Sequence, residues 1–151
     1  MATFFDGLFR NKVMLVGTVG WFTAQLLKFL YAMFVKKNLD FRYFVSTGGM
    51  PSSHSSFVTS ISTAVGFETG WDSAVFALAL AFSIVVMYDA AGVRLAAGRQ
   101  AEILNVIVDE LFHEHKIAER RLRELLGHTP IEVFSGALLG VIIAVLMARP
   151  A

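Results

Sequence analysis

The 151-residue sequence contains no cysteine, which excludes disulfide bonds and any chemistry that needs a thiolate. It is also poor in charge, because only 17% of its residues are Asp, Glu, Lys or Arg, whereas soluble domains have about 25%. Hydrophobic residues make up 56% of the chain. This composition indicates a membrane protein, and the length allows a single domain over residues 1–151. The net charge of +1 says little about partners, and no nucleic-acid partner is expected.

The chain contains several long apolar runs, which predict an all-α, polytopic membrane helix bundle. The predicted membrane-embedded helices, about four in number, cover residues 13–35, 53–67, 72–92 and 130–148. The first is long enough to cross a hydrocarbon core of about 30 Å. The second is short and rich in Ser and Thr, so we expect other helices to enclose it and its hydroxyl groups to bond carbonyl groups one turn earlier. Gly136 and Gly140 give the last helix a small face for close packing.

A charged amphipathic helix is predicted over residues 100–126, between the third and fourth membrane helices. Its apolar stripe repeats every seven residues, at Leu104, Leu111, Ala118 and Leu125. Such a helix lies on a membrane surface or pairs with a partner helix. The stripe is therefore compatible with a homodimer.

Basic residues are concentrated in two connections, the one after the first helix and the one after the third, whereas "ETGWD" between the second and third helices has none. The positive-inside rule places both basic connections in the cytoplasm. The expected location is a bacterial-type cytoplasmic (inner) membrane. The second and fourth helices then both begin at the cytoplasmic face.

Each of these two helix starts carries a histidine. "STGGMPSSHSS", residues 46–56, holds two glycines, a proline, His54 and six hydroxyl side chains, and "GHTP" holds His128. Thr129 is a suitable N-cap residue ahead of Pro130. The free N–H groups and positive dipole ends of two helices at one membrane face favour an anion, phosphate above all.

Other unusual residues fall at the same face. Lys28 lies within the first membrane helix, where a charge is costly and is a candidate for function. The remaining candidates for binding phosphate or supporting the site are Gly49, where backbone can approach a ligand closely, Ser52, Ser53, Arg94, Tyr88 and Asp89.

These residues predict phosphoryl transfer through histidine. His128 and Glu132 are four residues apart at a helix start, so the carboxylate can hold one ring nitrogen while the other attacks phosphorus. His54 can protonate the leaving oxygen near neutral pH. The arrangement requires no metal and no other cofactor. On structural grounds alone, Thr129 and Glu132 also form a T-x-x-E capping box.

Three segments carry a resemblance to a known family: "GGMPSSHSS", "MYDAAGVRLAAGRQAEILN" and "LRELLGHTPIEVFSGALLG". Together they resemble the divergent branch of the type-2 phosphatidic acid phosphatase and vanadium-dependent haloperoxidase-related superfamily. The resemblance implies that His54, at the end of a P-S-x-H motif, is the acid. It also implies that His128 is the nucleophile and that Glu132 takes the place of the family's orienting aspartate.

Two elements of the superfamily pattern are missing. The residue seven positions after Lys28 is Val35 rather than the arginine of an Arg-Pro pair, and Leu122 occupies the position of the arginine that precedes the nucleophile. Arg121, Arg123 or Arg94 is the expected substitute.

The leading hypothesis is a membrane phosphatase that hydrolyses a lipid phosphate or pyrophosphate through a phosphohistidine at the cytoplasmic face. One alternative is a catalytically degenerate membrane protein that binds lipid headgroups or phosphate. Another is a small anion or lipid transporter.

Overall fold

The computed structural model describes residues 4–34, 49–111 and 128–148. Over these residues the chain is all-α, as predicted, and its helices are α1 (Phe4–Arg10), α2 (Lys12–Phe34), α3 (Ser53–Thr69), α4 (Ala74–Ala91), α5 (Val93–Leu111) and α6 (Pro130–Ala148). Three stretches of these helices are long and apolar enough to cross a membrane: α2, α6, and the run Ala74–Ile107 that starts with α4.

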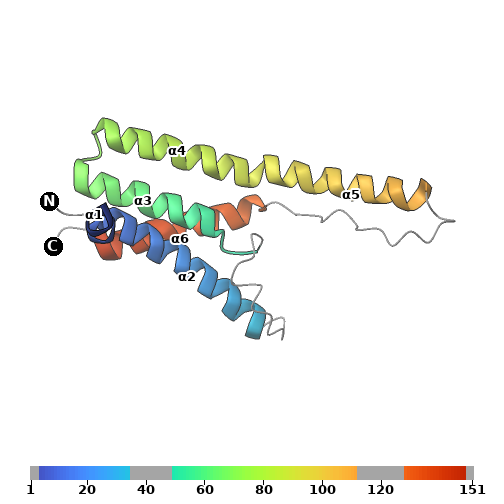
Figure 1. Cartoon of the computed structure of the whole chain (residues 1–151), viewed down its shortest axis with the longest axis horizontal. Helices are drawn as coiled ribbons and strands as arrows, with labels where there is room; N and C mark the ends of the chain where they lie inside the picture. Colours follow the sequence, from blue (N-terminus) through green and yellow to red (C-terminus); the bar gives the residue numbers. More distant parts are fainter. Residues whose placement is uncertain (1–3, 35–48, 112–127, 149–151) are drawn as a thin grey trace.

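The hydroxyl-rich helix α3 lies in the centre of the bundle and packs against α2, α4 and α6 (Figure 1). Enclosure was the expectation for this helix, since it is too polar to face lipid by itself. Its serine and threonine side chains are mostly buried, at positions 53, 55, 56, 59, 60 and 62. The neighbouring helices thus shield a polar helix from the bilayer.

The buried hydroxyl groups of α3 join the helices to one another. Ser56 Oγ donates to the carbonyl of Gly20 on α2 at 2.9 Å, and Ser60 Oγ donates to the carbonyl of Gly140 on α6 at 3.1 Å. Thr59 Oγ1 donates to Ser55 O at 2.7 Å, one turn earlier in its own helix, and to Ala137 O of α6 at 3.1 Å. The sequence predicted only the bonds within the helix; the bonds across helices form because glycine lets the backbones approach.

Gly136 and Gly140 form the small face that the sequence predicted for α6. A Cβ atom at Gly136 would collide with the carbonyl group of Ser52, and one at Gly140 would collide with Thr59 Oγ1 and the Ser56 carbonyl. Only glycine therefore fits at these two contacts between α6 and α3.

Polar caps set the helix starts. Asn11 Oδ1 accepts a hydrogen bond from Met14 N–H at 3.1 Å at the start of α2, and Ser73 Oγ accepts one from Phe76 N–H at 3.1 Å at the start of α4. The turn between α3 and α4 contains Gly70 at φ +91°, a conformation that glycine adopts without a steric penalty.

The amphipathic helix differs from the prediction at its start. It was expected to begin at residue 100, but α5 begins at Val93 and follows α4 in nearly the same direction (Figure 1). The reason is the backbone of Gly92, which is right-handed helical at φ −104° and ψ −72°, so the chain does not turn away. Residues 112–126 of the predicted helix lie outside the described part. The short helix α1 was not predicted.

Candidate active site

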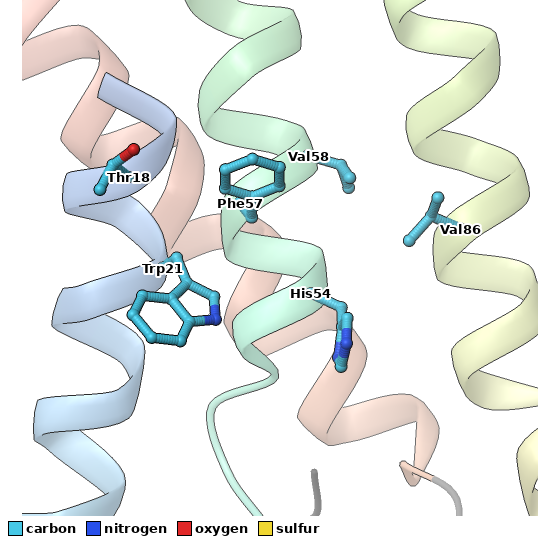
Figure 2. Close-up of a pocket in the computed structure, with 6 residues that line it drawn as sticks. All are labelled: Thr18, Trp21, His54, Phe57, Val58 and Val86. Carbon is cyan, nitrogen blue, oxygen red and sulfur yellow. The ribbon is translucent and has the colours of Figure 1, made fainter. Parts of the chain in front are cut away.

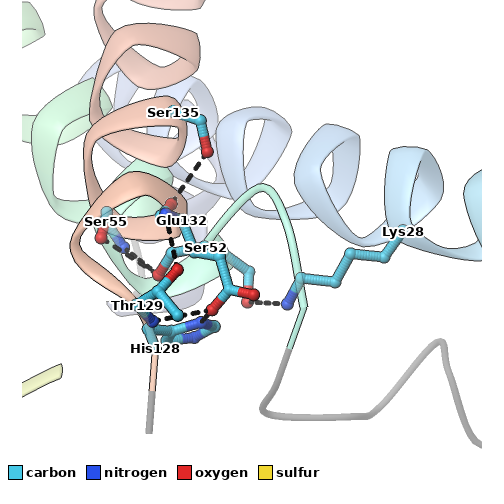
Figure 3. A network of polar contacts seen from close by, with 8 residues as sticks. Lys28, Ser52, Ser55, His128, Thr129, Glu132 and Ser135 are labelled. Atoms are coloured by element: carbon cyan, nitrogen blue, oxygen red, sulfur yellow. Dashed lines mark hydrogen bonds and ion pairs between the residues drawn. The ribbon is translucent and has the colours of Figure 1, made fainter. Parts of the chain in front are cut away.

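The candidate site lies where α3 and α6 begin and α4 ends. Ser52 caps α3, because its Oγ accepts a hydrogen bond from Ser55 N–H at 3.3 Å. Thr129 and Glu132 form the predicted capping box of α6: Glu132 N–H donates to Thr129 Oγ1 at 3.4 Å, and Thr129 N–H donates to Glu132 Oε2 at 3.0 Å. Ser52 N–H donates to the Glu132 carbonyl at 3.0 Å. This bond fastens the two helix starts together (Figure 3).

His128 is held from two sides. Its ring Nδ1 lies 3.1 Å from Glu132 Oε2, and its backbone N–H donates to the carbonyl of Ala90, near the end of α4, at 3.2 Å. The side chain is 1% exposed. With the proton on Nδ1 and directed at the carboxylate, Nε2 keeps the lone pair that a nucleophile needs. The contact with Glu132 therefore orients the ring and favours the tautomer in which Nε2 is unprotonated.

The second histidine lies beside the first. The ring centroids of His54 and His128 are 6.3 Å apart, with an angle of 64° between the ring planes. His54 comes from the first turn of α3 and is half-buried. One ring thus comes from α3 and the other from the residue two positions before α6, and they lie side by side.

Lys28 reaches the start of α3 from α2. It is 4% exposed, and its Nζ donates to Ser53 Oγ at 3.4 Å. Figure 3 shows its side chain extending toward the residues that surround Glu132. A buried ammonium group at this place supplies the positive charge that an anionic ligand requires.

The other predicted site residues are described by their position in the fold. Gly49 has φ +90°, which favours glycine, and is exposed. Tyr88 is 77% exposed on α4, so its side chain is not enclosed with the histidines. Asp89 is half-buried in the last turn of α4. Arg94 belongs to the first turn of α5, where only its backbone is described, and Arg123 lies outside the described residues.

Two buried polar residues were not among the predicted site residues. Ser55 is fully buried and donates from Oγ to Ser52 Oγ at 3.0 Å. Its signal was the spacing of three residues from Ser52, which returns to the same side of a helix start. Gln25, which interrupts the apolar run of α2, is 4% exposed; its signal was the spacing of three residues from Lys28.

An apolar cavity of about 350 Å³ adjoins His54. It lies between α2, α3 and α4 and is lined by Thr18, Trp21, His54, Phe57, Val58 and Val86 (Figure 2). Ligand sites are commonly cavities of this size, with an apolar lining and a few polar groups that set orientation. Here the polar group that can ionise is His54. The cavity therefore offers space for an apolar group next to the histidine pair.

No group of three or more His, Asp or Glu side chains that could hold a metal ion occurs among residues 4–34, 49–111 and 128–148.

Comparison with known proteins identifies the family to which the chain belongs. The sequence matches the Divergent PAP2 family over residues 9–143, so the chain belongs to that family, as the three motifs predicted. It is 41% identical to YuiD of Bacillus subtilis (strain 168), described as an uncharacterized membrane protein, over 152 residues that cover 93% of this chain and 96% of YuiD. No solved structure matches the chain. The relative and the three apolar stretches together identify a membrane protein.

Proposed function

We propose that the protein is a membrane phosphatase that hydrolyses a lipid phosphate or pyrophosphate through a phosphohistidine intermediate. The observation that carries the proposal is the contact of His128 Nδ1 with Glu132 Oε2 at 3.1 Å, with the His54 ring 6.3 Å from the His128 ring. In this proposal His128 is the nucleophile, Glu132 is the carboxylate that orients it, and His54 is the acid. Membership of the Divergent PAP2 family supports the reaction class.

In the first step, His128 Nε2 attacks phosphorus and the bond from phosphorus to the lipid oxygen breaks. Protonated His54 gives its proton to that oxygen, and the lipid alcohol, or the lipid monophosphate from a pyrophosphate, leaves. Glu132 stabilises the positive charge that forms on the phosphorylated imidazole. Lys28 and the N–H groups at the helix starts stabilise the negative oxygens of the phosphoryl group.

In the second step, His54 takes a proton from water as the water oxygen attacks phosphorus. The bond from phosphorus to His128 Nε2 breaks, inorganic phosphate leaves, and both histidines return to their starting protonation states. Every proton is thus carried by a side chain of the site, and no metal or other cofactor takes part.

The proposed orientation places the site at the cytoplasmic face of a bacterial-type inner membrane. The basic connections after the first and third membrane helices support this orientation. The end of the bundle with the histidines is also the end to which both connections attach. The lipid substrate would then come from the cytoplasmic leaflet, with its apolar part in the cavity next to His54.

The test is phosphate release by the purified protein in detergent. The substrates are phosphatidate, phosphatidylglycerol phosphate, and polyprenyl phosphates and pyrophosphates, each with and without EDTA and orthovanadate. We expect turnover that resists EDTA, is inhibited by vanadate and is lost in His128→Gln, a variant of similar side-chain volume. A folded protein that binds vanadate but releases no phosphate from any lipid would instead support a headgroup-binding role. Movement of labelled lipid phosphate or phosphate across sealed vesicles without hydrolysis would support transport.

A further inference from the structure

Gln25 is a buried polar residue to which the mechanism above gives no role. It lies in α2, its side chain is 4% exposed, and its Oε1 is buried. Within the described residues, no group donates a hydrogen bond to this oxygen. Buried polar atoms of proteins nearly always have a partner, and one that lacks it calls for an explanation, such as a catalytic role or the binding of a water molecule or ion.

The helical repeat places Gln25 between the cavity and Lys28. Seven residues make nearly two turns of an α-helix, so residues seven apart share a face. Gln25 is seven residues after Thr18, and Lys28 is seven after Trp21. Thr18 and Trp21 line the cavity together with His54 (Figure 2), and Lys28 contacts Ser53, the neighbour of His54, at 3.4 Å. The face of α2 that borders the cavity thus leads through Gln25 to the start of α3.

We propose that Gln25 is a ligand-binding residue of the candidate active site, and that its Oε1 accepts a hydrogen bond from a hydroxyl group of the ligand. The inference rests on the proposed function, which supplies the ligand class. A carbonyl oxygen repels the anionic oxygens that Lys28 attracts, but it binds an O–H group beside them. Two groups qualify: the P–OH of a monoanionic phosphate, and an alcohol on the headgroup next to the phosphate.

The proposal makes a prediction that a purely structural role does not. A glutamine that holds the bundle together would destabilise the protein when replaced. An acceptor that is unpaired in the free protein costs stability instead, so replacing it with an apolar side chain of similar shape is neutral or stabilising. Gln25→Met is suitable because methionine is unbranched and nearly the same length. The matched control is Ser83→Ala, which removes a buried hydroxyl that donates to the carbonyls of Val58 and Ala79, both at 2.9 Å.

The experiment compares the wild type, Gln25→Met and Ser83→Ala in detergent. The melting temperature of the ligand-free protein is measured first. KM is then measured for phosphatidylglycerol phosphate, which has an alcohol beside its phosphate, and for phosphatidate, which has none, together with inhibition by inorganic phosphate. We expect Gln25→Met to melt at or above the wild-type temperature and to bind about tenfold more weakly, the loss of about one hydrogen bond. Ser83→Ala should melt lower with an unchanged KM.

The set of ligands that Gln25→Met binds more weakly identifies the hydroxyl group that Gln25 accepts from. A tenfold rise in KM for phosphatidylglycerol phosphate alone assigns the alcohol. An equal rise for both lipids, with weaker inhibition by inorganic phosphate, assigns the P–OH group. Unchanged binding of all three ligands overturns the inference, as does a fall in melting temperature as large as that of Ser83→Ala, whatever happens to KM.

Phosphate release by the wild type shows whether the proposed function itself fails, separately from the role of Gln25. If it releases no phosphate, binding of inorganic phosphate and of intact phosphatidylglycerol phosphate is measured by calorimetry. Weaker binding to Gln25→Met then supports the role of Gln25 in a protein that binds but does not hydrolyse. Equal binding, or no binding by the wild type, overturns it.

Discussion

Replacing Glu132 with glutamine tests the contact on which the proposed chemistry depends. The change keeps the side-chain volume and leaves an oxygen that can accept from the N–H of Thr129, so the start of α6 should form as before. It removes the charge that faces His128 Nδ1 at 3.1 Å and Thr129 N at 3.0 Å. The wild-type carboxylate can only accept, whereas the amide also presents an N–H₂ donor that can face the ring in the wrong tautomer.

The expected changes in kcat and in stability of Glu132→Gln follow from the bonds of the carboxylate to His128 and Thr129. A hydrogen bond to a charged group contributes about 1.5–3 kcal/mol and a neutral one about 0.5–1.5 kcal/mol. Because the phosphorylated imidazole is positive, the bond to His128 is charge-assisted from both sides in the reaction. Its loss should raise the barrier by about 3 kcal/mol, which lowers kcat on the order of 100-fold. The free energy of unfolding should fall by only about 1 kcal/mol, the worth of a carboxylate at a helix N-terminus.

The measurement is kcat for phosphate release together with thermal unfolding in detergent. Thr129→Ala is the control, because it removes the cap bond from Glu132 N–H at 3.4 Å and leaves the carboxylate in place. It should cost about 1 kcal/mol of stability with kcat within a few-fold of wild type. Nitrogen-15 shifts of His128 give a readout that does not need activity: the wild type should be protonated at Nδ1, and the Glu132→Gln variant should be a mixture of tautomers.

One result would refute this reasoning. If Glu132→Gln keeps wild-type kcat, and its His128 keeps the Nδ1–H tautomer, then the carboxylate only caps α6 and does not orient a nucleophile.

Three further variants test other parts of the structure. Lys28→Met should raise KM for a lipid phosphate about 10- to 100-fold through the loss of a charged donor, with partial recovery in Lys28→Arg; equal KM values would remove Lys28 from the phosphate site. Gly140→Leu should lower stability by about 1–3 kcal/mol through overpacking against α3, whereas exposed Leu138→Ala should leave the melting temperature nearly unchanged; similar melting temperatures would contradict the contact. Val86→Trp should fill the cavity and raise KM for lipid phosphates but not for p-nitrophenyl phosphate, and a parallel rise for both would show that the cavity does not bind the apolar part.

Hydropathy and local spacing account for much of what could be predicted. Apolar runs predict α2, α4 and α6 because a membrane helix needs a long apolar stretch. The contact between His128 and Glu132 follows from their spacing of four at a helix start, and the capping box from Thr129 and Glu132. These features depend on residues close in the sequence, where the geometry of one helix is sufficient.

Features that depend on the packing of several helices could not be predicted from the sequence. Tyr88 is exposed although Ala90, two residues later, contacts His128 through its carbonyl, because the two side chains project in different directions from α4. The early start of α5 depends on the backbone conformation of Gly92, and a glycine in the sequence is compatible with either a turn or a continued helix. The burial of Gln25 became visible only with the neighbouring helices in place.

The bond from Ser52 N–H to the Glu132 carbonyl has a mechanical consequence. Together with Gly136, which lies against the carbonyl group of Ser52, it prevents α6 from sliding along α3 without breaking a buried hydrogen bond and forcing a collision. His54 lies in the first turn of α3 and His128 lies two residues before α6, so this joint also fixes the distance between their rings. Because His128 is also bonded to Ala90 near the end of α4, we expect the movement that admits a lipid to occur in α2, while the two histidines keep their relative positions throughout the reaction cycle.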